Sequence, residues 1–457
     1  MMRFNTVTGL NLSLMFGLLC GASAAGGQTE FEAGAASVDV TPSGPVWMAG
    51  FASRNRPSES VEAQLHAKAL AIRDGSGAVS VIVTADLIGF RRAISDVIAQ
   101  RCLEKYGLKR ERLLLNASHV HSGPELGISG GSVPPERAVR HQSMVKYTTE
   151  MMDRIVDLVG RAIGDLAPAR LEFGQGLAGF AVNRRRSRLN TRHLPGPVDH
   201  DVPVLAVRAP DGRIRAILFG YACHPTTMSA YLITADYPGY AQAEIERLYP
   251  GSVALFIQGC GADANPLPRF HSEDPALIRR SLELSKLYGK VLASAVDLTL
   301  RAQMTALNGP VLSVLESVDI PFESLPGRDE LEKRRSSAGP ERRSQAERLL
   351  KVLDAGSKPP DRQPYTIQVF QFGSGLKLIA LAGEVVADYA LRLKAAHGWE
   401  NTWMAAYSND IPGYIPSKRV LLEGGYETSG GAGGAYSTAI EEIIVEKVDA
   451  LVRRTNP

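Results

Sequence analysis

The chain has 457 residues, of which 44% are hydrophobic and 22% charged, and its formal net charge is +3. A nearly neutral charge and an isolated basic cluster, Arg184-Arg185-Arg186, without interleaved aromatic residues argue against a nucleic-acid-binding protein. The length would permit two or three domains, but no clear linker divides the chain.

The N-terminus has the composition of an export signal. It reads Met1-Met2-Arg3, then an apolar stretch from Leu10 to Cys20, then Ala22-Ser23-Ala24, which supplies small residues suitable for cleavage. We therefore predict a signal peptide over residues 1–25 and a secreted or periplasmic mature protein. A membrane anchor is the alternative. The apolar core is short for a bilayer and no other stretch is long enough, so we expect no transmembrane segment after cleavage.

Three cysteines follow the predicted signal peptide, namely Cys102, Cys223 and Cys260. An odd and sparse set argues against a disulfide scaffold, although it leaves room for one bridge in an oxidising compartment. We expect these cysteines to act as small, buried apolar residues.

Strand-like and helical runs alternate along the chain. The strand-like runs are Val79 to Thr84, Leu113 to Leu115, Val202 to Val207, Ile214 to Leu218, Val253 to Ile257, Lys377 to Leu381 and Thr402 to Tyr407. The helical runs are Ala93 to Tyr106, Met144 to Ile163, Tyr240 to Leu248, Pro275 to Leu300 and Glu384 to Ala396. This alternation indicates a layered α/β domain with a mixed central sheet flanked by helices. Residues 26–457 are expected to form this one domain, with its chemistry at strand exits and loops.

One segment departs from this alternation. From Arg328 to about Arg362 the chain is rich in Glu, Lys, Arg and Ser, and it is broken by Gly339-Pro340 and Pro359-Pro360. Charge runs usually face water, so we predict a solvated helical excursion. A cover over the mouth of the active site is the alternative.

Two histidines separated by one residue follow the run from Leu113 to Leu115. His119 and His121 point to the same side of an extended segment, and the turn Ser122-Gly123-Pro124 leaves them at the mouth of a loop. Neutral imidazole is a favoured zinc ligand, so the pair predicts a metal site with further ligands from elsewhere. A chance pair in a loop is the alternative that this motif leaves open.

A third histidine, His224, lies just past the apolar run from Ala216 to Gly220. The residue before a proline is pushed out of the helical region, so His224, which precedes Pro225, is expected in extended backbone at a strand exit. Its position fits a metal ligand or a hydrogen-bonded structural histidine.

Five separated motifs have the order and approximate spacing of one enzyme family. They are His119-Val120-His121-Ser122-Gly123-Pro124, Cys223-His224-Pro225-Thr226-Thr227, Gly261-Ala262-Asp263-Ala264-Asn265-Pro266, Gly383-Glu384 and Gly413-Tyr414-Ile415-Pro416-Ser417. In these motifs the chain resembles the neutral (alkaline, non-lysosomal) ceramidase family. The resemblance runs from Asp39-Val40-Thr41-Pro42 to about Tyr426, and the agreement of five motifs makes it specific.

The resemblance implies a zinc amidase. It matches His119, His224, Glu384 and Tyr414 to the metal ligands of the family, and His121 to a second histidine that lines the site. Two nitrogens and a carboxylate leave coordination space for water, which zinc acidifies towards neutral pH. Tyr414 either ligates the metal or donates to the substrate carbonyl oxygen as negative charge develops there.

The third motif departs from the family pattern. Ceramidases carry Gly-Asp-Val-Ser-Pro-Asn at this point, and their serine, often given as the nucleophile, is replaced by Asn265. An amide cannot attack a carbonyl as a hydroxyl does, so covalent serine catalysis is not available at this position. We expect Asn265 to orient water or to bond a substrate oxygen. Asp263 either serves the site or bonds its own backbone within a glycine-rich turn.

Two further sets of polar residues have competing interpretations. Asp86 follows a strand-like run, and it either buttresses a ligand histidine or caps the next helix. Arg184 and Arg185 lie in a short motif, Asn183-Arg184-Arg185, that is similar to one in the family. They either bind a carboxylate or phosphate of the substrate or form an exposed arginine pair.

Together these features predict an exported zinc hydrolase that cleaves a linear, small-molecule or lipid-like amide of the N-acyl type with metal-activated water. The immunoglobulin-like domain that ceramidases carry after the catalytic one is not expected, because about 30 residues follow Tyr426 and such a sandwich needs about 100. The expected absence of this domain favours a substrate smaller or more polar than ceramide. The alternatives are an esterase or lactonase on the same scaffold, or a non-catalytic binding homologue.

Overall fold

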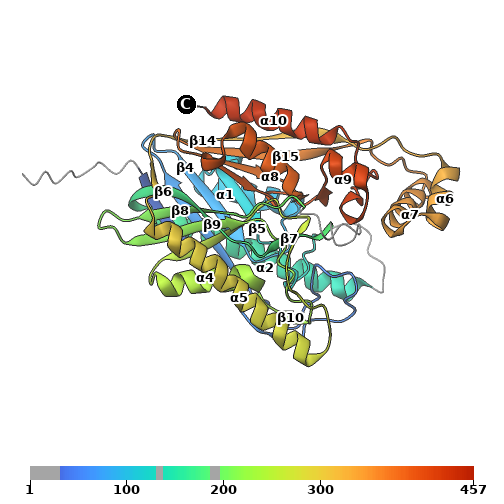
Figure 1. The fold of residues 1–457 in the computed structure, drawn as a ribbon, viewed down its shortest axis with the longest axis horizontal. Coiled ribbons are helices and arrows are strands. Elements are labelled where there is room, and N and C mark those ends of the chain that lie inside the picture. The colour runs from blue at the N-terminus through green and yellow to red at the C-terminus, as the bar shows by residue number, and fades with distance from the viewer. Residues whose placement is uncertain (1–30, 130–136, 186–195, 457) are drawn as a thin grey trace, which may run out of the picture.

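The computed structural model describes residues 31–129, 137–185 and 196–456 (Figure 1). The predicted signal peptide lies outside these ranges. Within them, no helix has both the length and the apolar character needed to cross a bilayer.

A nine-stranded sheet lies at the centre of the fold. Its strands are β1 (Phe31–Asp39), β3 (His66–Arg73), β4 (Val79–Ala85), β5 (Leu113–Ala117), β6 (Ala167–Leu177), β8 (Asp201–Arg208), β9 (Ile214–Tyr221), β11 (Val253–Gln258) and β13 (Thr305–Leu307). The spatial order is β11-β9-β8-β6-β1-β3-β4-β5, and β13 pairs with β6. The middle of the sheet is antiparallel, whereas β4 with β5 and β9 with β11 are parallel. The sheet is therefore mixed, as predicted.

A second sheet packs face to face on the first. Its strands, in spatial order, are β14 (Val311–Pro321), β15 (Arg362–Phe372), β16 (Leu376–Leu381) and β18 (Thr402–Ala405). The two sheets share one core, in which Leu114 and Leu218 of the large sheet lie with Phe370 and Trp403 of the small one. Successive side chains of a strand point to opposite faces, so each strand of the large sheet serves this core and the helices behind it.

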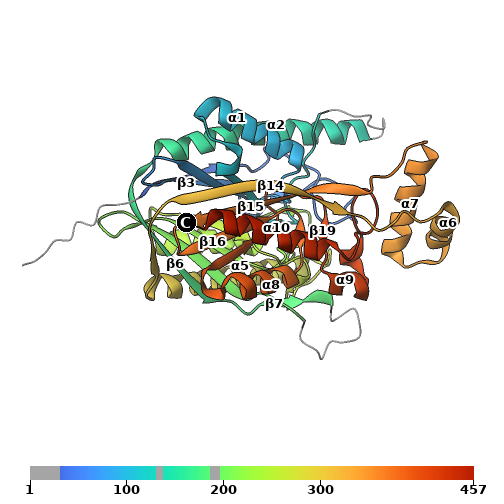
Figure 2. The same cartoon turned by 90° about the horizontal axis from the view of Figure 1, so that it is seen from above.

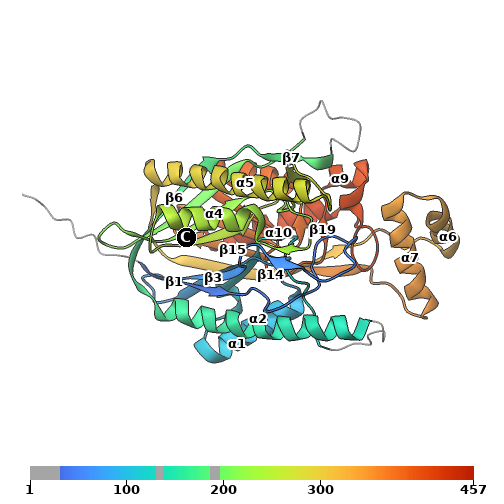
Figure 3. The same ribbon diagram turned by 90° about the horizontal axis from the view of Figure 1, so that it is seen from below.

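Helices cover the outer face of each sheet. On the large sheet, α1 (Arg92–Tyr106) and α2 (Ala138–Gly164) cover one half, and α4 (Asp236–Leu248) and α5 (Pro275–Arg301) cover the other. The small sheet is covered by α8 (Ala387–His397) and α10 (Ile440–Thr455). Figures 2 and 3 show α2 and α5 on opposite sides of the molecule. The layered α/β architecture is confirmed, with a second sheet added to it.

The charged segment forms a helical hairpin, α6 (Arg328–Ser337) and α7 (Pro340–Asp354), which projects from one end of the molecule (Figure 1). A small core of its own consists of Leu331, Ala346, Leu349 and Leu350. Arg348 Nη2 donates to the carbonyl oxygen of Ser429 at 3.1 Å, which ties the hairpin to the body. The segment is helical over α6 and α7 and largely exposed.

Short strand pairings bring loop segments together. They are β2 (Ser60–Val61) with β10 (Leu232–Ile233), β7 (Ala181–Asn183) with β12 (Ala264–Pro266), and β17 (Glu384–Val385) with β19 (Tyr414–Ile415). The other short elements are η1 (Arg110–Arg112), η3 (Trp399–Asn401), α9 (Lys418–Glu423) and η4 (Tyr426–Thr428). The pairing of Glu384 with Tyr414 corrects the predicted helix from Glu384 to Ala396, because Val386 is extended and the helix begins at Ala387.

The three cysteines that follow the predicted signal peptide behave as expected. Cys102, Cys223 and Cys260 are buried free thiols.

Candidate metal centre

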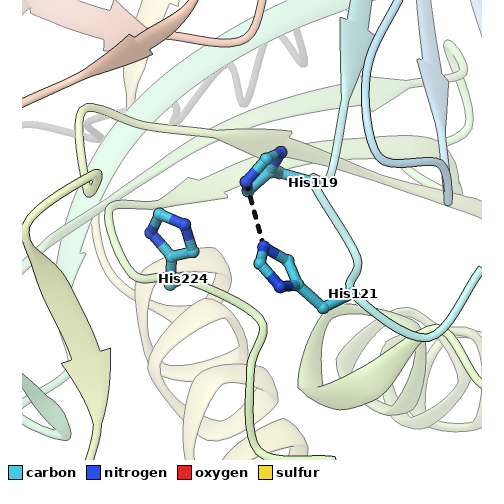
Figure 4. Close-up of side chains that lie close together, drawn as sticks. All are labelled: His119, His121 and His224. Carbon is cyan, nitrogen blue, oxygen red and sulfur yellow. Dashed lines mark hydrogen bonds between the residues drawn. The ribbon is translucent and has the colours of Figure 1, made fainter. Parts of the chain in front are cut away.

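His119 and His224 lie just beyond the ends of two strands of the large sheet. Strand β5 ends at Ala117 and β9 ends at Tyr221, so each histidine follows its strand closely. The two ring centroids are 4.8 Å apart. His121 completes a group of three rings that face one another (Figure 4). The strand exits predicted from the sequence therefore converge on one point.

Glu384 brings a carboxylate to these histidines. One ligating nitrogen from each of His119, His121 and His224 lies within 4.8 Å of the other two, and all three side chains are buried. The Oε2 atom of Glu384 is 3.3 Å from His119 Nε2 and 3.3 Å from His224 Nε2. A buried group of nitrogens and one carboxylate oxygen could bind a metal ion.

Backbone carbonyls fix the tautomers of two of these histidines. His119 Nδ1 lies 2.6 Å from the carbonyl oxygen of Ile88, and His224 Nδ1 lies 3.1 Å from that of Gly261. Because a carbonyl oxygen only accepts, we assign the hydrogen to each Nδ1 and a lone pair to each Nε2. Both lone pairs then face the Glu384 carboxylate with no proton between them. His224 Nε2 and Glu384 Oε2 have no hydrogen-bond partner in the described part of the chain. Such an electron-rich cluster fits a cation.

The protonation states suit metal binding. Burial lowers the pKa of His224 to about 4. Burial, reinforced by His119 and His224, holds the pKa of His121 well below its usual value. Burial acts to raise the pKa of Glu384, and a proton on His119 or His224 acts to lower it. At neutral pH, His121 and His224 are therefore neutral and Glu384 is a carboxylate, which are the forms that ligate metals.

A tight loop holds His121 in place. The Nη1 atom of Arg54 donates to the carbonyl oxygens of His121 at 2.5 Å and Ala49 at 2.6 Å. Gly50, at φ +95°, lies so close that a Cβ atom there would come within 2.4 Å of the His121 ring. Arg54 is buried, and burial lowers its pKa to about 10. Sequence reasoning did not single out either residue.

A cleft of about 340 Å³ opens over the centre. Its floor includes the predicted site residues His119, His121, Glu384 and Tyr414. Its wall includes the apolar side chains of Ala49, Ile88, Leu126, Met144 and Ile411 and the charged side chains of Arg91 and Glu125. A cleft with polar side chains at its floor and apolar side chains in its wall suits a ligand that has a polar group attached to a hydrocarbon part.

Tyr414 is held from behind by a buried ion-pair network. Arg184 Nη2 donates to the Tyr414 hydroxyl oxygen at 3.1 Å, and Arg184 Nε donates to Glu427 Oε1 at 2.8 Å. Glu427 also accepts from Arg185 at 2.5 Å. Arg185 in turn pairs with Glu423. The expectation of an exposed arginine pair is therefore wrong, because both side chains are largely buried against Glu427.

Asp263 and Asn265 lie in the shell around the centre. Asp263 Oδ1 accepts from the Ala387 amide and Oδ2 accepts from Asn183 Nδ2, both at 2.9 Å. Burial raises the pKa of Asp263 to about 6. Asn265 Oδ1 accepts from the Thr226 hydroxyl at 3.4 Å, and Asn265 is not among the residues that line the cleft. The expected catalytic roles of Asp263 and Asn265 stay predictions.

Both interpretations of Asp86 are wrong. Its Oδ2 atom accepts from the His66 amide at 3.0 Å and its Oδ1 atom accepts from Gln242 Nε2 at 3.2 Å. The ring of His119 is held by Ile88 instead, and α1 begins only at Arg92. Asp86 therefore links β3 to α4 as a buried structural acid.

Two aromatic residues at the centre were not predicted as site residues. The ring of Tyr426 lies 5.3 Å from that of Tyr414 and lines the cleft. The ring of Tyr407 lies 4.3 Å from that of His119. Tyr407 ends the predicted run from Thr402, so the strand-exit argument that singled out His224 could have found it as well.

Comparisons with known proteins give a family match and similar folds. The family model described as neutral/alkaline non-lysosomal ceramidase, N-terminal, matches residues 31–262. The chain is similar to the crystal structure of neutral ceramidase from Pseudomonas aeruginosa, with a TM-score of 0.71 and 21% identity over 94% of this chain and 76% of that one. It is also similar to a "Ceramidase complexed with C2", with a TM-score of 0.71, 20% identity and the same coverage. At these identities the likeness shows the fold. No curated protein matches.

Proposed function

Because this chain belongs to the neutral/alkaline non-lysosomal ceramidase family, we propose that it is a zinc-dependent hydrolase of linear N-acyl amides. Family and fold support a hydrolase that acts on ceramide-like amides. The observation that carries the proposal is the position of Glu384 Oε2, which lies 3.3 Å from His119 Nε2 and 3.3 Å from His224 Nε2. The apolar cleft walls support an acyl chain on the substrate.

In this proposal His119, His224 and Glu384 hold zinc, and Tyr414 is the fourth ligand or a donor to the substrate oxygen. A zinc ion held there supplies Lewis acidity, which acidifies water and polarises a carbonyl group. The Tyr414 hydroxyl accepts from Arg184, so its own hydrogen is free to point at the developing negative charge. The carbonyls that bond His119 and His224 keep both rings in the ligating orientation.

His121 is proposed to handle protons. Its Nε2 atom lies 3.1 Å from His119 Nε2, beside the proposed zinc site. In the hydrolysis water gives up a proton as its oxygen bonds to the carbonyl carbon, the carbon–nitrogen bond breaks, and the leaving nitrogen takes up that proton. A buried imidazole that lines the cleft is placed to deliver that proton.

Water is proposed as the nucleophile, because the position of the family serine holds Asn265. We propose that Asn265 acts by fixing Thr226 beside His224, and that Asp263 fixes the start of α8 just after Glu384. Export is proposed on the strength of the N-terminal sequence alone.

One experiment tests the function most directly. The purified protein is treated with a chelator, then with zinc, and assayed on N-acyl amides of graded chain length and on the matching esters. We expect amide hydrolysis that the chelator abolishes and zinc restores. Hydrolysis of esters only would favour the esterase alternative, and no hydrolysis with zinc bound would favour the binding homologue.

Metal analysis of single variants tests the ligands. His119→Ala, His224→Ala and Glu384→Ala are expected to lose zinc. His271→Ala is the matched control, because His271 lies near the site but bonds the carbonyl oxygen of Thr226 and is no member of the metal-binding group. Stoichiometric zinc in all three ligand variants would refute the site.

A further inference from the structure

We infer that Tyr407 is a positioning residue of the metal centre, an inference that rests on the zinc site proposed above. Its ring contacts both histidines that the proposal assigns to the metal. The Tyr407 centroid lies 4.3 Å from that of His119 at an interplanar angle of 31°, and 6.2 Å from that of His224 at 85°. One buried ring therefore limits the rotation of two imidazoles that come from different strands.

The backbone of Tyr407 joins the segments that carry the proposed ligands. Its amide donates to the carbonyl oxygen of Gly383, the residue before Glu384, at 3.0 Å. Its carbonyl oxygen accepts from the amide of Ala117, at the end of the strand before His119, at 3.3 Å. Tyr407 has φ +51°, a left-handed conformation that is unfavourable for a residue with a side chain and that clusters at functional sites. The residue is thus fixed between the histidine loop and the glutamate strand.

The contribution belongs to the ring and not to the hydroxyl group. The Tyr407 hydroxyl is buried and has no hydrogen-bond partner among the residues that the structure describes. It therefore orients neither histidine, whose Nδ1 atoms already bond the carbonyls of Ile88 and Gly261. The hydrogen bonds to the carbonyl oxygens fix where one edge of each imidazole points, whereas the neighbouring Tyr407 ring limits rotation of each imidazole about that bond. Both restraints are needed to keep the Nε2 atoms aimed at one point.

Zinc affinity of the purified protein, measured by competition with a chelating dye, tests this inference. We expect the zinc affinity of Tyr407→Phe to be within about twofold of that of the parent protein. We expect the zinc affinity of Tyr407→Leu to be at least about tenfold lower, which is typical for the loss of a group that supports metal ligands. The absorption bands of the cobalt-substituted protein should shift in Tyr407→Leu and stay unchanged in Tyr407→Phe. Neither readout depends on turnover.

Tyr365→Leu is the matched control. Tyr365 on β15 is equally buried, its hydroxyl also lacks a partner in the described part of the chain, and it packs in the core between the small sheet and its helices. We expect Tyr365→Leu to lower the melting temperature with zinc affinity unchanged. If Tyr407→Leu does not fold, Tyr407→Met is used in its place, because methionine keeps most of the side-chain volume. The same loss of zinc affinity is expected.

The outcomes separate the two proposals. No zinc binding by the parent protein would refute the proposed function and, with it, the inference. Zinc binding by the parent with equal affinity in Tyr407→Leu would refute the inference alone. A loss in Tyr407→Phe as large as in Tyr407→Leu would assign the effect to the hydroxyl group and overturn the role given to the ring.

Discussion

The guanidinium of Arg184 donates to the hydroxyl oxygen of Tyr414 at 3.1 Å, although the two residues are 230 positions apart in the chain. Arg184 is in turn bonded by Glu427, which also bonds Arg185. Three charges are thus buried behind the cleft, and the position of the Tyr414 phenol depends on all of them. Burial, reinforced by Glu384 and only partly opposed by Arg184, holds the pKa of Tyr414 well above its usual value, so the phenol keeps its hydrogen and can donate it to a developing oxyanion.

We predict that Glu427→Gln destabilises the protein by about 3 kcal/mol, because it leaves two buried guanidinium groups without their shared carboxylate. Amide hydrolysis should fall as well, since Arg184 no longer holds Tyr414. Denaturant unfolding and kcat measure the two effects. Glu316→Gln is the control: Glu316 pairs with Lys447 and Arg454 at the surface and is about one third exposed, so its loss should cost less than about 1 kcal/mol. Equal effects of the two substitutions would contradict the buried-network argument.

Gly50→Ala is expected to lower kcat by roughly 100-fold through displacement of the His121 ring, because a misplaced catalytic group loses near-attack geometry. A Cβ at Gly50 would come within 2.4 Å of that ring. Gly77→Ala is the matched control, because Gly77 also has a positive φ, +83°, but a Cβ there meets nothing within 4 Å. Gly77→Ala should change stability with kcat unaltered, and a similar loss of kcat in both variants would rule out the steric explanation.

The metal-free protein should lose stability on acidification through His224. The pKa of His224 is about 4 in the folded state and 6.5 ordinarily. Between pH 4 and pH 6.5, His224 is therefore protonated in the unfolded chain and neutral in the folded protein. The contribution of His224 to the free energy of unfolding is fully present above pH 6.5. It decreases by on the order of 3 kcal/mol as the pH falls from 6.5 to 4. Asp263, whose pKa is raised to about 6 by burial, acts in the opposite direction.

The measurement for His224 is the difference in unfolding free energy between the parent and His224→Gln at pH 7 and pH 4.5, both without metal. Asp263 is present in both proteins, so its effect cancels in the difference. The stability advantage of the parent over the variant should shrink on acidification. A difference that does not vary with pH would show that His224 titrates normally in the folded protein.

Asn265→Ser should not create a covalent mechanism. Asn265 bonds Thr226 and lies away from the residues that line the cleft, so a serine there is expected to change kcat/KM by less than about tenfold. Mass spectrometry during turnover should detect no acyl-enzyme. His121→Ala is the comparison variant, with a loss of roughly 100-fold expected if it handles the proton. Accumulation of an acyl-enzyme in Asn265→Ser would contradict the water mechanism.

The sequence by itself determined the local features of the site. Apolar runs predicted where strands end, and these exits predicted the positions of His119 and His224. The resemblance to the ceramidase family added Glu384 and Tyr414, which pair in β17 and β19. These features follow from short stretches of chain, because strand periodicity and turn chemistry are local properties.

Tertiary structure alone decided how the site is held. The carbonyls of Ile88 and Gly261 set the tautomers of the two histidines, and Tyr407 packs against both rings. Glu427 makes Arg184 and Arg185, for which an exposed pair was one of two alternatives, into a buried support for Tyr414. These partners meet only because two sheets stack and their strands end beside one another. Strand order and stacking depend on the packing of the whole core, which no local pattern encodes.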